Sequence, residues 1–249
     1  MTTPFNTPTS AAPQLVFIPG LAGDATMWQT QCPAMPAALR PIVTTAHMDE
    51  TAQRIEDMAA LLLQAHKGPL LLCGASMGGM IAMEAVRQAP ERIAGLALLG
   101  TTAQPESPAM RALREAAIAL FEQGRVREVI EPNVSFAFHP CHAAQPELVQ
   151  AYLDFVLRAG PEQLVRQNRA VIHRPDARQH LSRVNCPTLV MCGDADQLTP
   201  PACSQEIAAL IPHADYTVLT ECGHMLTMEQ PAAVNRLLLR WLARGGWGN

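Results

Sequence analysis

The sequence predicts an α/β fold: a mostly parallel sheet of about six strands flanked by helices, with a helical cap inserted after the fourth strand. Short apolar runs alternate with helical patterns along much of the chain, which is typical of a parallel sheet with crossover helices. Residues 103–184 break this rhythm, because they carry helical periodicity and no comparable strand. With 249 residues, 49% of them hydrophobic and 16% charged, the chain can bury a core of the size that this fold requires.

The strands are expected where short apolar runs lie between turn residues. Several of these runs are continuously apolar, as expected for strands that helices cover on both faces. In chain order the six runs are Leu15–Pro19, Pro41–Thr45, Leu70–Cys73, Ile93–Leu99, Thr188–Cys192 and Tyr216–Leu219.

The insertion, residues 103–184, is expected to form several short helices, because proline and glycine interrupt it repeatedly. Helical patterns cover Met110–Gln123, Leu148–Ala159 and Glu162–Val171. The insertion leaves the sheet after one strand and returns before the next, so it is expected to lie over the carboxyl ends of the strands, where open α/β sheets bind ligands. The sequence therefore predicts a core domain of residues 1–102 and 185–249 and a cap of residues 103–184.

A candidate nucleophile follows the third expected strand. The segment Gly74-Ala75-Ser76-Met77-Gly78-Gly79 joins that strand to the helical pattern Met80–Gln88. A serine in G-x-S-x-G between a strand and a helix occupies a strained turn that exposes its hydroxyl. The N–H of Met77 opens the helix without an intrahelical acceptor, so it can stabilise an oxyanion. The alternative is an ordinary glycine-rich turn.

A serine hydroxyl needs a base, and His224 is the favoured one of eight histidines. It follows the last expected strand, and Gly223 permits a turn that would carry the imidazole over the sheet edge. His47 also follows an expected strand and is the weaker alternative. The remaining histidines fall in helical or linker segments.

The base in turn needs a carboxylate, and the loop after the fifth expected strand offers Asp194 and Asp196. Either could instead cap the helix that begins near Pro200. The other position for an acid, after the fourth strand, is Gly100-Thr101-Thr102 and has no carboxylate. The residue pattern alone leaves Asp194 and Asp196 both open.

A second oxyanion donor is expected after the first strand, where Pro19-Gly20-Leu21 follows the apolar run. The N–H of Leu21 is the candidate, because Gly20 leaves room for a reacting carbonyl oxygen. The alternative is a Pro-Gly turn that only ends the strand.

The order of these motifs resembles the α/β-hydrolase fold family over almost the whole chain. The turn GASMGG is similar to the family's nucleophile elbow, GDADQLTPP to its G-x-x-D-x-x-x-P and GHMLTMEQP to its G-H-x-x-x-x-E-x-P. The resemblance implies that Ser76 is the nucleophile, Asp196 the acid and His224 the base. It also implies that Leu21 and Met77 provide the oxyanion hole.

Two departures from the family accompany this resemblance. Many relatives have His-Gly where this chain has Pro19-Gly20, and the segment Met1–Gln14 leaves little room for their N-terminal hairpin. Serine at position 76, where the dehalogenase and epoxide-hydrolase branches have aspartate, argues against both branches.

The expected function is a cofactor-independent serine hydrolase that cleaves a small carboxylic ester, or a related lactone or thioester, through an acyl-enzyme. One alternative is a C–C bond hydrolase of diketone-like substrates that uses the same three residues. A second alternative is a receptor for a small ligand on a hydrolase scaffold.

Composition and charge restrict the partners. The net charge of −4 and the absence of a basic stripe argue against nucleic acid. No secretory signal and no apolar run of about 18 residues is found, so no membrane association and a cytoplasmic location are expected. The seven cysteines include no C-x-x-C pair, which favours reduced thiols. The oligomeric state is left open.

No cofactor or metal is expected. The ligand spacing in His139-Pro140-Cys141-His142 is poor for zinc. Four arginines near the end of the insertion could receive a substrate carboxylate or phosphate, although Asp176 could pair with one of them. These are Arg166, Arg169, Arg174 and Arg178.

Overall fold

The computed structural model describes residues 12–248, so residues 1–11 of the expected core domain and residue 249 lie outside it. Six strands form one sheet in the order β2-β1-β3-β4-β5-β6, and every neighbouring pair is parallel. The expected α/β class with about six strands is confirmed. The strands are β1 (Gln14–Ile18), β2 (Ile42–Val43), β3 (Leu70–Ala75), β4 (Ile93–Leu99), β5 (Thr188–Gly193) and β6 (Asp215–Leu219).

Ten α-helices and six short 3-10 helices accompany the sheet within the described residues. The α-helices are α1 (Ile55–Ala65), α2 (Met77–Gln88), α3 (Pro108–Phe121), α4 (Val126–Ile130), α5 (Pro140–Ala143), α6 (Pro146–Ile172), α7 (Arg178–Leu181), α8 (Pro201–Leu210), α9 (Leu226–Glu229) and α10 (Pro231–Arg244). The 3-10 helices are η1 (Ala25–Trp28), η2 (Cys32–Ala34), η3 (Ala37–Leu39), η4 (Ala46–Met48), η5 (Pro90–Arg92) and η6 (Glu131–Ala137).

Side chains on the two faces of the sheet enter two separate hydrophobic layers, because alternate residues of a strand point to opposite faces. Val16 and Leu72 pack into the layer that contains α1 and α2, together with Ile207 of α8. Phe17 and Leu71 enter the other layer, which contains η1 and α10. Helices on both faces explain why β1, β3 and β5 are almost entirely buried.

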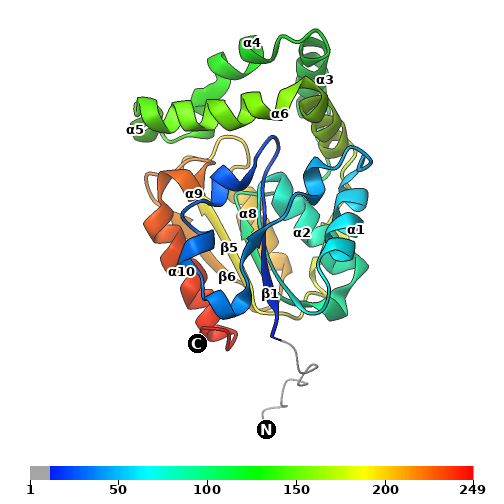
Figure 1. Ribbon diagram of the computed structural model, residues 1–249, viewed down its shortest axis with the longest axis vertical. Helices are drawn as coiled ribbons and strands as arrows, with labels where there is room; N and C mark the ends of the chain where they lie inside the picture. The colour runs from blue at the N-terminus through cyan, green and yellow to red at the C-terminus, as the bar shows by residue number, and fades with distance from the viewer. Residues whose placement is uncertain (1–11, 249) are drawn as a thin grey trace.

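The helices between β4 and β5 form a third group. Figure 1 shows α3, α4, α5 and α6 at the end of the sheet towards which β1 runs, beyond the helices that cover its faces. Helix α6 joins two of the expected helical patterns across a kink, because Gly160 has a φ of 75° and Pro161 follows it. The second half of α6 is mostly buried, whereas the first half is more exposed. No helix within residues 12–248 combines the length and apolar character needed to cross a bilayer.

Candidate active site

Ser76 lies in a tight turn between β3 and α2. Its φ of 54° and ψ of −120° place it in a region that residues other than glycine rarely adopt. The turn is held by a hydrogen bond from the Ser76 N–H to the Leu99 carbonyl (2.9 Å) and by one from the Thr101 hydroxyl to the Ser76 carbonyl (2.7 Å). The surrounding structure therefore maintains the strain of this turn.

The glycines around Ser76 are required by close backbone approaches. A Cβ atom on Gly78 would lie 2.0 Å from the Ile18 carbonyl oxygen, and one on Gly74 would lie 2.3 Å from the Gly78 carbonyl oxygen. Neither neighbour is a flexible side chain that could move aside. The GASMGG sequence thus allows α2 to begin directly against the end of β1.

Ser76, His224 and Asp196 form a continuous hydrogen-bonded chain. His224 Nε2 lies 2.9 Å from Ser76 Oγ, and His224 Nδ1 lies 2.8 Å from Asp196 Oδ2. Ser76, His224 and Asp196 follow β3, β6 and β5, respectively, and these strands end at the same edge of the parallel sheet. If Nδ1 carries the proton that it donates to the carboxylate, Nε2 accepts the hydrogen bond from the serine hydroxyl.

The Asp196 carboxylate is fully buried and receives several hydrogen bonds. The N–H groups of Leu198 and Thr199 both donate to Oδ1 at 2.9 Å, and the Thr199 hydroxyl donates to Oδ2 at 2.8 Å. Burial raises the pKa of Asp196, but the charge and hydrogen bond of His224, together with the bonds from Thr199, outweigh burial and lower that pKa below its ordinary value. The carboxyl group is therefore ionised at neutral pH.

The negative charge of Asp196 raises the pKa of His224. Burial alone lowers this pKa, but the charge of Asp196 and the hydrogen bond to it act in the opposite direction and prevail. Glu229 adds to the increase, and Arg114 opposes it. The imidazole is thus made a stronger base than an isolated histidine.

The other two candidates have different partners. Asp194 accepts hydrogen bonds from the N–H groups of Glu221 and Cys222, both at 3.1 Å, so it braces the loop that precedes His224. His47 is buried, and its Nε2 lies 2.8 Å from the Gly23 carbonyl oxygen. Burial lowers the pKa of His47.

Leu21 and Met77, the two expected oxyanion donors, lie on either side of Ser76: Leu21 in the loop after β1 and Met77 at the first position of α2. A Cβ atom on Gly20 would lie only 3.2 Å from the Ser76 Cβ, which places the loop after β1 against the serine. Within residues 12–248, neither the Leu21 N–H nor the Met77 N–H donates to a protein acceptor. Both donors therefore remain available to another acceptor.

Glu229, which is not among the site residues predicted from the sequence, holds the loop that carries His224. Its side chain is fully buried and accepts hydrogen bonds from the N–H groups of Gly223 (2.9 Å) and Met225 (3.0 Å), one on each side of His224. It also accepts from the His139 N–H of the insertion (2.8 Å). The one sequence signal was its position in GHMLTMEQP, where it matches the glutamate of the similar family motif.

Gly100 keeps space free beside Asp196 and His224. A Cβ atom there would lie 3.1 Å from Asp196 Oδ2 and 3.5 Å from His224 Nδ1, and the φ of Gly100 is +47°. We expect Gly100→Ala to reduce kcat by about 10²-fold, because small displacements of catalytic groups cost that much. We also expect it to lower the free energy of unfolding by about 1–2 kcal/mol, because alanine is strained at this φ. Steady-state kinetics and chemical denaturation measure the two effects.

Gly124→Ala is the matched control, because Gly124 has a φ of +75° and no atom within 4 Å of an added Cβ. It should show the loss of stability without the loss of kcat. Equal kcat values for the two variants would contradict the prediction that a Cβ atom at position 100 displaces Asp196 or His224.

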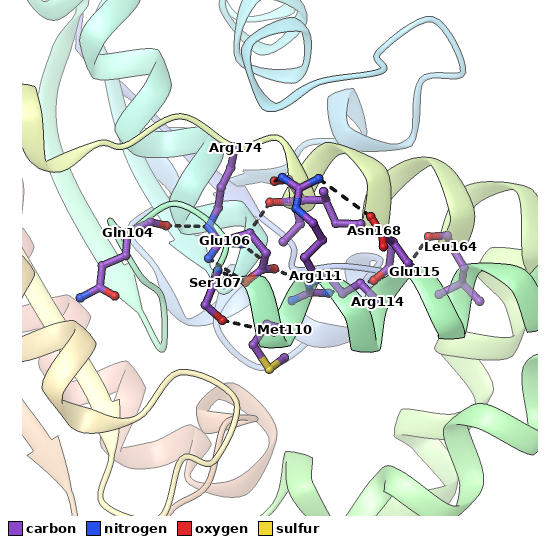
Figure 2. Close-up of polar contacts among 12 residues, drawn as sticks. Gln104, Glu106, Ser107, Met110, Arg111, Arg114, Glu115, Leu164, Asn168 and Arg174 are labelled. Atoms are coloured by element: carbon purple, nitrogen blue, oxygen red, sulfur yellow. Dashed lines mark hydrogen bonds and ion pairs between the residues drawn. The ribbon is translucent and has the colours of Figure 1, made fainter.

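The four arginines proposed from the sequence as anion ligands already have protein partners. Arg174 binds Glu106 and the carbonyl groups of Gln104 and Val171, and Figure 2 shows Arg114 on the same carboxylate. Arg178 pairs with Asp176, which is the alternative to anion binding that the sequence offers. The remaining contacts join Arg169 to Glu122 and Arg166 to the Met48 carbonyl. These contacts hold the base of the insertion together.

An open cleft of about 310 Å³ lies between the start of α6 and the core. Leu148 lines it from α6, and Met27 and Met228 line it from η1 and α9. Ser76 and His224 are not among its lining residues. Met27 links the two regions, because its methyl group would be 3.7 Å from a Cβ atom on Gly20, beside the serine.

The protein is similar in sequence and structure to known hydrolases. A family model described as "Serine aminopeptidase, S33" matches residues 43–231. RutD of Serratia proteamaculans, a proposed carbamate hydrolase, is 27% identical over 95% of this chain and 93% of its own. A thermophilic esterase from Thermogutta terrifontis, solved with malate bound, has a TM-score of 0.85 and 26% identity and covers 95% of this chain and 92% of its own. An enol-lactonase from Burkholderia xenovorans shares the fold, with a TM-score of 0.80, 21% identity and coverage of 94% and 92%.

The parallel sheet and the serine turn at its edge define a protein of the α/β-hydrolase class. With a family match over most of its length, the chain belongs to the serine aminopeptidase S33 family of α/β hydrolases. It is therefore a hydrolase.

Proposed function

We propose that the protein is a cofactor-independent serine hydrolase that cleaves a small carboxylic ester, or a related lactone or thioester. The observation that carries the proposal is the hydrogen-bonded chain from Ser76 Oγ through His224 to Asp196, with distances of 2.9 and 2.8 Å. These distances lie within the range that proton transfer from a nucleophile to a base requires.

In the proposed reaction, Ser76 Oγ attacks the carbonyl carbon while its proton passes to His224 Nε2. The negative charge that develops on the carbonyl oxygen is stabilised by the N–H groups of Leu21 and Met77. His224 then protonates the leaving alcohol or thiol, the carbonyl re-forms and an acyl group remains on Ser76. A water molecule that loses its proton to His224 releases the acid and restores the serine. Asp196 stays ionised and stabilises the imidazolium at each stage.

We infer that residues 103–184 act as a cap over this site. Ala137 supports the inference, because its carbonyl accepts hydrogen bonds from the N–H groups of His224 (3.0 Å) and Met225 (3.1 Å). The insertion thus contacts the histidine loop directly. The cleft beside Met27 and Leu148 would receive part of the substrate.

The cleft of about 310 Å³ is small, and most large aromatic residues of the insertion are used for packing. Phe138 and Phe155 are almost fully buried, and both rings pack edge-on against Tyr152. A small substrate therefore fits this part of the protein better than a long acyl chain.

Activity-based labelling tests the proposal. A fluorophosphonate probe should modify the folded protein at Ser76, and p-nitrophenyl acetate should be turned over by the same sample. Exposed Ser182 is the matched control, because Ser182→Ala should keep both labelling and turnover. A folded protein that is not labelled, but binds a small ligand tightly, would instead support the receptor alternative.

The bond that is cleaved is tested with a panel of substrates of similar size. Esters, lactones and thioesters should be cleaved faster than a carbamate, the class that the name of the relative RutD indicates, and faster than a diketone-like compound. Preferred cleavage of a diketone would support the C–C hydrolase alternative. Preferred cleavage of the carbamate would move the substrate class to that of the relative.

A further inference from the structure

Three potential metal ligands meet at the start of α5. His139, Cys141 and His142 each contribute a nitrogen or sulfur atom, and these atoms all lie within 4.8 Å of one another. His139 caps α5 and its Nδ1 lies 2.8 Å from Cys141 Sγ, while the first turn of the helix brings His142 round to the same side. The sequence spacing argues against zinc, but the folded chain brings the three ligand atoms together.

A buried carboxylate contacts one ring nitrogen of His142. His142 Nδ1 lies 3.0 Å from Glu229 Oε2, and the Glu229 side chain is fully buried. When Nδ1 donates to this carboxylate oxygen, Nε2 of the neutral imidazole keeps the lone pair that a metal ion requires. A carboxylate on the far nitrogen of a ligating histidine is the usual support of zinc-binding imidazoles.

We propose that His139, Cys141 and His142 form a binding site for Zn²⁺, with water as the fourth ligand. Two imidazoles and one thiolate suit this borderline-soft cation, and three protein ligands leave one tetrahedral position open. Ligand atoms around tetrahedral zinc lie roughly 3.5 Å apart, given bonds of about 2.0–2.3 Å. The exposed Cys141 side chain can rotate to close the remaining distance, and its thiol releases a proton to solvent on binding.

Zinc at this site would tie the insertion to the histidine loop. Glu229 accepts hydrogen bonds from His139 and His142 on one side and from Gly223 and Met225 on the other. A metal ion that fixes both imidazoles would therefore stabilise the contact between the two segments. The proposal does not depend on the proposed function.

Metal binding by the purified, metal-free protein tests the site. Equilibrium dialysis should give one Zn²⁺ per chain, and Co²⁺ should produce the near-ultraviolet absorption band of a thiolate ligand. Cys141→Ser should remove that band, and both Cys141→Ser and His142→Ala should weaken Zn²⁺ binding by about 100-fold. Zn²⁺ should raise the melting temperature of the wild type and not of these variants.

Cys203→Ser is the matched control, because Cys203 is a partly exposed free cysteine outside the cluster. It should retain the Co²⁺ band and the Zn²⁺ affinity. Melting temperatures without metal establish that each variant is folded. Unchanged zinc binding by folded Cys141→Ser and His142→Ala, or no binding by the wild type, would overturn the proposal.

Discussion

Ser76→Ala should lower kcat for a short acyl ester by roughly 10⁴- to 10⁶-fold, because the attacking oxygen is lost and only binding and the oxyanion donors remain. KM should change little, because the variant leaves the cleft and both N–H donors in place. Burst and steady-state kinetics with p-nitrophenyl acetate measure the effect.

The fold should survive this change. The hydrogen bonds that hold the turn involve the backbone of Ser76, while its hydroxyl contacts His224. The Ser76→Ala variant therefore has the same strained φ and ψ at position 76 and keeps the backbone hydrogen bonds that hold the turn. A folded variant that kept a tenth or more of the wild-type kcat would show that another group is the nucleophile.

Asp196→Asn should reduce kcat by about 10⁴-fold at neutral pH, because an amide does not hold the imidazole in the required tautomer. The pH profile should change as well. The active form has a neutral His224, so kcat/KM of the wild type should fall as the pH drops through the His224 pKa, which lies above the ordinary 6.5. Without the Asp196 charge that pKa decreases, so the acid limb of the residual activity should move to lower pH.

Asp194→Asn is the matched control for Asp196→Asn, because Asp194 braces the Glu221 and Cys222 N–H groups instead of contacting His224. Its acid limb should stay where it is in the wild type. A shift of the limb in this variant, and none in Asp196→Asn, would reverse the assignment of the two carboxylates.

The sheet could be predicted from the sequence because its strands are covered on both faces. Burial on two faces requires continuous apolar runs, so β3, β4 and β5 were located to within two residues at each end. Strand β2 is only two residues long, and the wider run Pro41–Thr45 overestimated it. The helical patterns Leu148–Ala159 and Glu162–Val171 lie on either side of Gly160, whose non-helical φ of 75° and ψ of 167° kinks α6 where the sequence places the break.

The site was less fully predictable because its partners are distant in sequence. Asp194 and Asp196 are the same residue type two positions apart, and they are distinguished only in the folded loop, where Gly193 lies against the backbone of Cys222 and Gly223. Glu229 acts mainly on backbone N–H groups, which every sequence offers equally. The hydrogen bond from the His139 N–H to Glu229 depends on how the insertion packs against the core, and no local sequence pattern predicts it.

The two ends of the insertion are neighbours, since the Ala177 N–H donates to the Ala103 carbonyl at 2.9 Å. Strands β4 and β5 lie side by side, so the insertion between them begins and ends at nearly the same place in the core. Its entropic cost during folding is that of closing a single loop, which grows by only about 0.6 kcal/mol for each doubling of loop length. Evolution can therefore lengthen, shorten or exchange the insertion while the order of the strands stays the same. Such changes would alter which substrates reach Ser76.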